Sequence, residues 1–231
     1  MHLFILGATG RTGVLALRYA LEQGHNVTVL VRNQAAVETH PNLTIIEGSV
    51  LCKTDIDRAF TAAGTPVDAA LQFLNSPRAS DGPWAKWHGP ARLIADSTAL
   101  VTEALRNQQR PHGAPKPRLV VLSALGAGES RKVAGYFVRF MTDHTNVGYT
   151  YEDHNAVDAE IEGNCADKVA WTSAMAVFFS GAGVKPVKTF TATGTGFSMF
   201  ITRESTARWM VDVACGKFGD EFANQRVVMS N

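Results

Sequence analysis

The sequence Gly7-Ala8-Thr9-Gly10-Arg11-Thr12-Gly13 decides the fold, because it joins a short apolar run to an amphipathic one. The apolar run is His2 to Leu6, and after the glycines Val14, Leu17 and Leu21 recur at a helical spacing. Glycines between a strand and a helix let a pyrophosphate approach the backbone N–H groups at the helix start. The stretch therefore predicts a dinucleotide-binding turn, and its alternative is a turn that holds no ligand. Valine at Gly10 or Gly13 is expected to abolish cofactor binding and to leave the fold largely intact.

Apolar runs of strand length alternate with helical stretches through most of the chain. Such alternation is typical of βαβ units, and it predicts an α/β fold with a parallel sheet. The chain has 231 residues, enough to bury one core, so we expect a single domain over residues 1–231. After the first run, the predicted strands are residues 26–32, 43–46, 67–73, 118–123 and 169–174.

Three stretches interrupt this rhythm, at residues 75–90, 127–150 and 175–202, and we interpret them as the segments of a substrate pocket. The first is rich in Pro and Gly and is predicted to be a loop, and a last helix is predicted after the third, near residues 203–215. Aromatic side chains in these stretches would suit a pocket for a flat or bulky apolar molecule, although some also fit ordinary core packing. They are Trp84, Trp87, Tyr136, Phe137, Phe140, Phe178, Phe179 and Phe197.

Composition excludes several classes of partner. The 22 Lys and Arg residues balance 21 Asp and Glu residues without a basic tract, so no nucleic-acid partner is indicated. The three cysteines are far apart and form no C-x-x-C pair, so neither a metal site nor a disulfide framework is expected. The first apolar run is too short for a signal peptide or a membrane span, which favours a soluble cytoplasmic protein. The sequence carries no signal for an oligomeric state.

The residue that closes the second predicted strand selects the cofactor type. An acidic residue there would bind the ribose 2′-OH, whereas an arginine accommodates a 2′-phosphate. Here the strand ends in Arg32, and Arg11 in the glycine turn offers a second cation. The nearest acidic residue that follows, Glu38, lies several residues beyond the strand. The pattern predicts NADP(H), and its alternative is a pair of solvated surface arginines.

These motifs resemble the atypical short-chain dehydrogenases, specifically the NmrA-like and biliverdin/flavin reductase-like families. The similarity is specific over residues 1 to about 75 and weakens after about 175. It implies a Rossmann-type, doubly wound parallel sheet with a small C-terminal substrate-binding portion. It also implies that Ser49 and Val50 lie beside the adenine, Leu74 and Asn75 beside the nicotinamide ribose, and Ser123 beside the nicotinamide. The motifs that carry it are the glycine turn, Val27-Thr-Val-Leu-Val-Arg32, Gly48-Ser49-Val50-Leu51, Val120-Val-Leu-Ser-Ala124 and Glu152-Asp153-His154 at a predicted helix start.

The sequence departs from the typical dehydrogenases in one respect, because no tyrosine is followed four residues later by lysine. The tyrosine–lysine mechanism is therefore excluded in its usual form. By resemblance, Ser123 and His154 flank the nicotinamide, where a hydroxyl can stabilise an oxyanion and a histidine that titrates near neutrality can donate a proton. Tyr151 is a third candidate donor. The alternatives are a backbone hydrogen bond for Ser123 and a neighbouring carboxylate partner for His154.

The resemblance implies an NADPH-dependent reductase of a hydrophobic, conjugated or carbonyl-bearing small molecule. Two alternatives stay open. One is a cyclase or isomerase of secondary metabolism in which the bound cofactor shapes the pocket. The other is an NmrA-like module that senses the cofactor and regulates a partner protein.

Overall fold

The predicted parallel sheet is present in the computed structural model, which describes residues 1–75, 78–80, 82–165 and 167–231. All runs predicted as strands form strands, with ends that shift by a few residues. The strands of the main sheet are β1 (His2–Leu6), β2 (Asn26–Val31), β3 (Leu43–Glu47), β4 (Ala69–Gln72), β5 (Arg118–Ala124), β6 (Ala170–Ala176), β8 (Lys188–Thr191) and β10 (Gln225–Ser230).

The strand order identifies the sheet as doubly wound. The described residues form an eight-stranded sheet in the order β3-β2-β1-β4-β5-β6-β10-β8. Its first part, from β3 to β6, has the strand order of dinucleotide-binding sheets, and every pair within it is parallel. The chain adds strands β1 to β3 toward one edge of the sheet and β4 to β6 toward the other, so the order of the strands reverses between β1 and β4. Sheets of this kind bind their ligands at that point, outside the carboxyl ends of the strands.

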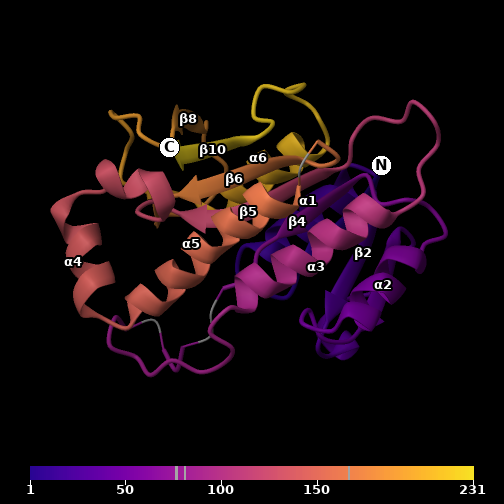
Figure 1. Cartoon of the computed structure of the whole chain (residues 1–231), viewed down its shortest axis with the longest axis horizontal. Coiled ribbons are helices and arrows are strands. Elements are labelled where there is room, and N and C mark those ends of the chain that lie inside the picture. Colours follow the sequence, from indigo (N-terminus) through magenta and orange to yellow (C-terminus); the bar gives the residue numbers. More distant parts are fainter. Residues whose placement is uncertain (76–77, 81, 166) are drawn as a thin grey trace.

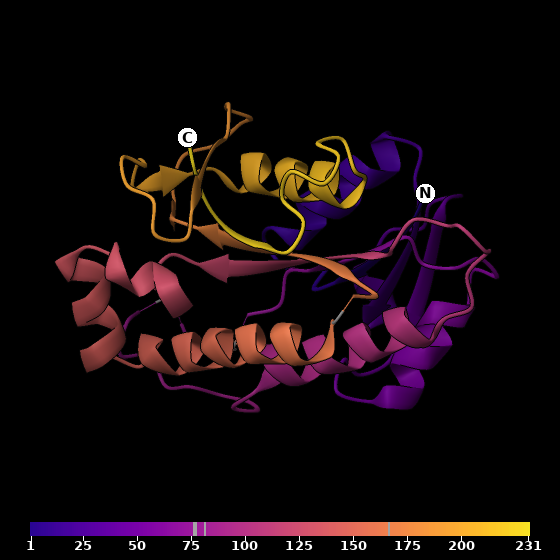
Figure 2. The same ribbon diagram turned by 45° about the horizontal axis from the view of Figure 1, so that its top comes forward.

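Helices cover both faces of the sheet, and each face has its own apolar core (Figures 1 and 2). One core joins the sheet to α1 and α6, and the other joins it to α2, α3 and α5. The short helix α4 lies beyond the end of the sheet toward which β6 and β10 point (Figure 1). The helices are α1 (Gly13–Glu22), α2 (Lys53–Thr61), α3 (Leu93–Asn107), α4 (Tyr136–His144), α5 (Val147–Asn164) and α6 (Arg203–Ala214), with short 3-10 turns η1 (Gln34–Ala36) and η2 (Gly128–Lys132).

The C-terminal part contains strands that the sequence did not predict. β10 pairs in parallel with β6, and β8 adds an antiparallel edge to β10. A separate two-stranded sheet joins β7 (Phe178–Phe179) to β9 (Phe200–Ile201). The segment between residues 175 and 202 therefore contains regular structure, in β7, β8 and β9.

One predicted boundary is wrong. The Glu152-Asp153-His154 motif does not open a helix, because α5 begins at Val147. Residues 152–154 therefore lie in the second turn, where Asp153 and His154 are buried and Glu152 points outward. His154 is thus held by packing within a helix and not at a helix terminus.

Candidate cofactor and substrate site

The glycine turn lies at the carboxyl end of β1 and leads directly into α1. Gly7 has a φ of 75°, and a Cβ atom there would lie 2.8 Å from the carbonyl carbon of Phe73. A Cβ atom at Gly13 would lie 2.1 Å from the carbonyl oxygen of Gly7. Both positions therefore require glycine for the turn itself to form.

The start of α1 offers free hydrogen-bond donors. Thr12 precedes the helix, and its side chain makes no capping bond. Among the described residues, the backbone N–H groups of Thr12 and Gly13 have no hydrogen-bond acceptor. Thr9, Gly10 and Arg11 are exposed in front of them. Open N–H groups at the positive end of a helix dipole fit the pyrophosphate that the sequence predicted.

Arg32 lies where the sequence predicted, immediately after β2 and exposed to solvent. An acidic side chain from the neighbouring strand lies beside the loop that follows Arg32. Glu47, the last residue of β3, stands beside Val31 in the sheet, and its carboxylate accepts a 3.0 Å hydrogen bond from the N–H of Gln34. The register of β2 and β3 brings Glu47 close to the loop that follows β2. The sequence of β2 alone does not indicate this neighbour.

The predicted adenine residues lie in the loop that follows β3. Ser49 is exposed and Val50 is half-buried. The carboxylate of Asp55, in the first turn of α2, accepts a 2.8 Å hydrogen bond from the N–H of Ser49. Asp55 therefore fixes the loop and leaves the Ser49 side chain at the surface, available to a ligand.

The end of β4 reaches the glycine turn. The N–H of Phe73 donates to the carbonyl of Leu6 at 3.0 Å, so Leu74 and Asn75 follow beside Gly7. Leu74 is half-buried and Asn75 is exposed. The residues predicted around the cofactor thus come from the ends of β1 to β5 and share one edge of the sheet.

Ser123 lies near the end of β5 with only 4% of its surface exposed. Leu119 and Val121, which precede it on the same face of the strand, belong to the core beneath α3 and α5. Its Oγ atom has no hydrogen-bond partner within the described part of the chain. The alternative of a backbone hydrogen bond for this hydroxyl is therefore wrong, and a buried hydroxyl without a partner is costly unless a ligand satisfies it.

His154 lies on the face of α5 that packs against the sheet, in line with Val157 and Ile161. It is 6% exposed, and its Nδ1 atom has no partner among the described side chains and backbone groups. Burial lowers the pKa of His154 from 6.5 to about 4. The expectation of a histidine that titrates near neutrality is therefore wrong, as is that of a carboxylate partner: desolvation keeps the imidazole neutral at pH 7.

The buried His154 is expected to make the protein less stable in acid. Its folded pKa is below the unfolded value, so the unfolded chain binds a proton that the folded chain does not, and stability falls from pH 6.5 toward pH 4. Between pH 7 and pH 5 the wild type should lose about 2 kcal/mol more unfolding free energy than His154→Gln. Urea unfolding of both proteins at the two pH values measures this difference. Equal losses would mean that His154 is solvated.

Tyr151 is less suited to proton donation than the sequence suggested. Its hydroxyl donates a 2.9 Å hydrogen bond to the carbonyl of Leu125, and burial raises its pKa to about 12. The proton of Tyr151 is therefore committed to the backbone. The same bond ties α5 to the chain two residues after Ser123, which places the second turn of α5 beside the end of β5.

Asp153 is a positioning residue that sequence analysis did not single out. Its carboxylate accepts hydrogen bonds of 2.9 Å from the N–H groups of both Ile94 and Ala95, at the start of α3. An anion there also complements the helix dipole. Asp153 therefore locks α5 to α3 and fixes the depth at which His154 meets the sheet.

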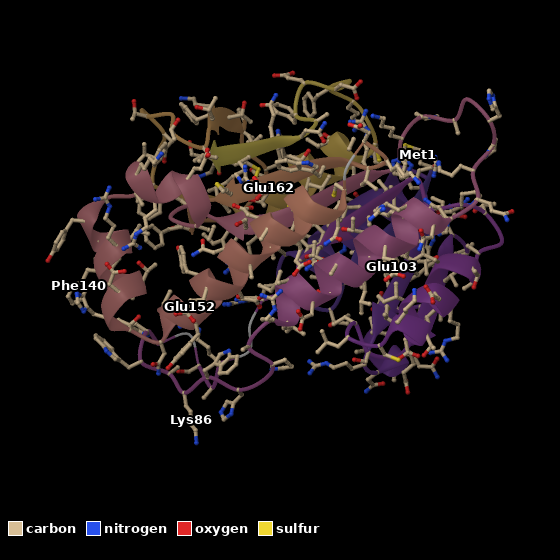
Figure 3. All side chains as sticks on the ribbon, viewed as in Figure 1. Met1, Lys86, Glu103, Phe140, Glu152 and Glu162 are labelled. Carbon is tan, nitrogen blue, oxygen red and sulfur yellow. The ribbon has the colours of Figure 1, made fainter. Side chains whose placement is uncertain are left out.

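Seven of the eight predicted aromatic side chains divide into two groups, and the eighth, Trp87, is half-buried and stacks on Tyr149. Tyr136 and Phe137 on α4 are 83% and 61% exposed, and Phe140, Phe178 and Trp84 are also exposed. Phe137 and Phe178 lie together, with ring centroids 6.0 Å apart, and Figure 3 shows Phe140 on the outer side of α4. Phe179 and Phe197 instead pack against the core beside α6. The exposed group gathers beyond the carboxyl end of the sheet.

Two further expectations concern metals and membranes. The described residues contain no cluster of His, Cys, Asp and Glu side chains that could hold a metal ion. None of the described helices is long and apolar enough to span a bilayer.

The chain matches a known family over most of its length. A family model described as NAD(P)H-binding matches residues 7–215, from the first glycine of the turn to the residue that follows α6. The match includes every predicted cofactor and catalytic residue.

Solved structures show the same fold at low sequence identity. A short-chain dehydrogenase/reductase from Veillonella parvula, in complex with NADP, is 14% identical with a TM-score of 0.72, and the match covers 100% of this chain and 94% of that one. ChuY from Escherichia coli, named an anaerobilin reductase, is 13% identical with a TM-score of 0.71 and coverages of 100% and 97%. A protein from Streptococcus pneumoniae, named a putative NADH-flavin reductase, is 16% identical with a TM-score of 0.67 and coverages of 100% and 99%. These structures confirm the predicted Rossmann-type fold.

Proposed function

Because the chain belongs to the NAD(P)H-binding family, we propose that it is an NADPH-dependent reductase of a flat, hydrophobic molecule with a conjugated or carbonyl group. One observation carries the proposal. Ser123 Oγ and His154 Nδ1 are buried polar atoms without partners within the described residues, at the edge of the sheet where dinucleotide-binding folds hold the nicotinamide. Buried polar atoms without hydrogen bonds destabilise a protein, and a bound ligand that forms those hydrogen bonds offsets the loss.

When bound, NADPH supplies a hydride to an electrophilic carbon of the substrate and becomes NADP⁺. As charge develops on the conjugated oxygen, the hydroxyl of Ser123 donates a hydrogen bond to it. His154 is neutral at pH 7, so it orients the substrate through its ring nitrogen and supplies no proton of its own. The proton that completes the reduction comes from water.

The exposed aromatic side chains beyond the proposed nicotinamide site favour a flat, apolar substrate. The exposed rings of Tyr136, Phe137 and Phe178 belong to segments near the carboxyl ends of the strands. Large exposed aromatic side chains in a group mark a binding surface more often than single ones do. Two similar structures are named an anaerobilin reductase and a putative NADH-flavin reductase, and both names describe reductases.

Arg32 is the proposed ligand of the 2′-phosphate. A charge-assisted contact of this kind contributes about 1.5–3 kcal/mol, so Arg32→Ala should weaken NADPH binding by roughly 10- to 150-fold. NADH affinity should change little. Fluorescence titration of both cofactors measures the effect, with Arg208→Ala as a control because Arg208 is also an exposed arginine and lies on α6. Equal losses for NADPH and NADH would remove Arg32 from the 2′-phosphate site.

The reductase itself is tested by NADPH oxidation against quinones, flavins, enones and imines, with product analysis by mass. Oxidation of one NADPH for each reduced product supports the proposal. Conversion to an isomer without NADPH consumption would favour the cyclase or isomerase. Cofactor binding without turnover of any acceptor would favour the sensing module.

A further inference from the structure

The first two turns of α5 carry another buried hydroxyl, that of Thr150. Thr150 is 8% exposed, and its Oγ1 atom has no hydrogen-bond partner among the residues that the structure describes. It lies four residues before His154, so both side chains lie on the face of α5 that continues into Val157 and Ile161. The unpartnered atoms Ser123 Oγ, His154 Nδ1 and Thr150 Oγ1 therefore all lie in the layer between α5 and the carboxyl end of the sheet.

Three other buried threonines, which lie within helices, satisfy their hydroxyls. Thr98, Thr102 and Thr206 each donate to the carbonyl four residues earlier in their own helix, at 2.7, 2.8 and 3.1 Å. This bond is the ordinary one for a helical threonine. Thr150 makes no such bond within the described chain, although its helix begins before it. Burial of this hydroxyl therefore lowers stability, because no hydrogen bond within the described chain compensates for its loss of contact with water.

A donor from the preceding loop lies beside the same part of α5. The ring of Trp87 stacks on that of Tyr149 with centroids 5.6 Å apart, and its Nε1 atom is buried without a partner in the described chain. Asn146 donates to the carbonyls of Trp84 and Ala85 at 3.1 and 3.2 Å, which holds this loop against the start of α5. Figure 3 shows Lys86 of the same loop below Glu152 of α5.

We propose that Thr150 is a substrate-binding residue that selects molecules with a second polar oxygen. Four helical residues separate Thr150 from His154 by about 6 Å along the axis of α5. The substrate oxygen that binds Thr150 therefore lies about 6 Å from the substrate group that contacts His154. Trp87 Nε1, on the side of the loop, donates a hydrogen bond to the same oxygen. The ligand class is a flat conjugated molecule with acceptor oxygens on opposite edges. This inference rests on the proposed reductase function.

The test uses a pair of quinones and a pair of threonine variants. Menadione carries its carbonyls on opposite edges of the ring, and 1,2-naphthoquinone carries them side by side. Thr150→Val keeps the shape and removes the hydroxyl, and Thr150→Ser restores it. We expect Thr150→Val to raise KM for menadione roughly three- to tenfold, with kcat and NADPH affinity unchanged. KM for 1,2-naphthoquinone should not change, and Thr150→Ser should resemble the wild type.

A stability measurement separates a ligand contact from a structural one. Without substrate, Thr150→Val should raise Tm by a few degrees, because it removes an unsatisfied buried hydroxyl. Thr102→Val is the matched control and should lower Tm, because it removes a satisfied one.

Three results would overturn the inference: a lower Tm for Thr150→Val, an unchanged KM for menadione, or equal increases in KM for the two quinones. If neither quinone is reduced, the reductase proposal fails on its own. Fluorescence quenching by menadione then still tests Thr150, because weaker binding to Thr150→Val supports the contact and equal binding contradicts it.

Discussion

Ser123→Ala is expected to lower kcat by a factor on the order of 10²–10³ while NADPH affinity stays nearly unchanged. The hydroxyl is buried at the end of β5 and has no partner within the described residues, so its hydrogen bond is free for the oxyanion that forms on the substrate. Removing one such donor costs about 2.7–4 kcal/mol of transition-state stabilisation. Steady-state kinetics with the best acceptor of the panel, together with NADPH titration, measures both quantities.

Ser173 provides a control for this substitution. It is also fully buried, and its Oγ atom likewise has no partner in the described chain. It lies on β6 beside Val121, two residues further from the carboxyl edge than Ser123. Ser173→Ala should therefore leave kcat unchanged. If both variants behave alike, Ser123 is a structural residue of the core.

Gly10→Val is expected to abolish NADPH binding and to leave the fold intact. A Cβ atom at Gly10 would lie 3.2 Å from the carbonyl oxygen of Gly7, a contact that a small shift relieves. The rest of a valine side chain would occupy the space in front of the helix start, where the pyrophosphate binds. NADPH titration with circular dichroism separates loss of binding from loss of structure.

The choice of glycine matters for this test. The sequence motif does not distinguish Gly10 from Gly13, and for Gly13 the expectation of an intact fold is wrong. A Cβ atom there would lie 2.1 Å from the Gly7 carbonyl oxygen, so the turn itself would have to open. Gly163→Val, at an exposed and uncrowded position of α5, controls for the general cost of valine. Normal NADPH binding by Gly10→Val would show that the turn holds no pyrophosphate.

The sequence predicted the part of the fold that depends on local pattern. Apolar runs such as His2–Leu6 and Arg118–Ala124 are buried strands, and their length and spacing follow from the sequence itself. Because parallel strands end at one edge, the predicted cofactor residues that follow different strands also had to meet there.

Features that depend on tertiary packing escaped prediction. β10 pairs with β6, a partner about 50 residues away, and no periodic pattern marks this pairing. Glu47 approaches the loop after β2 through the register of β3. The lowered pKa of His154 arises from burial beneath the sheet, which a sequence does not display. Each of these features depends on which segments the fold brings together.

Transfer of deuterium tests the proposed function most directly. NADPH with deuterium at both hydrogens of nicotinamide C4 is incubated with the enzyme and the acceptor that the panel identifies, and the product is analysed by mass. With an enone or imine acceptor, a reductase yields a product with one carbon-bound deuterium for each NADP⁺ formed. With a quinone or flavin, the transferred deuterium exchanges with water, and hydride transfer is instead measured as slower NADP⁺ formation from the deuterated cofactor. An isomeric product without deuterium, formed while NADPH is not consumed, would contradict hydride transfer at this site.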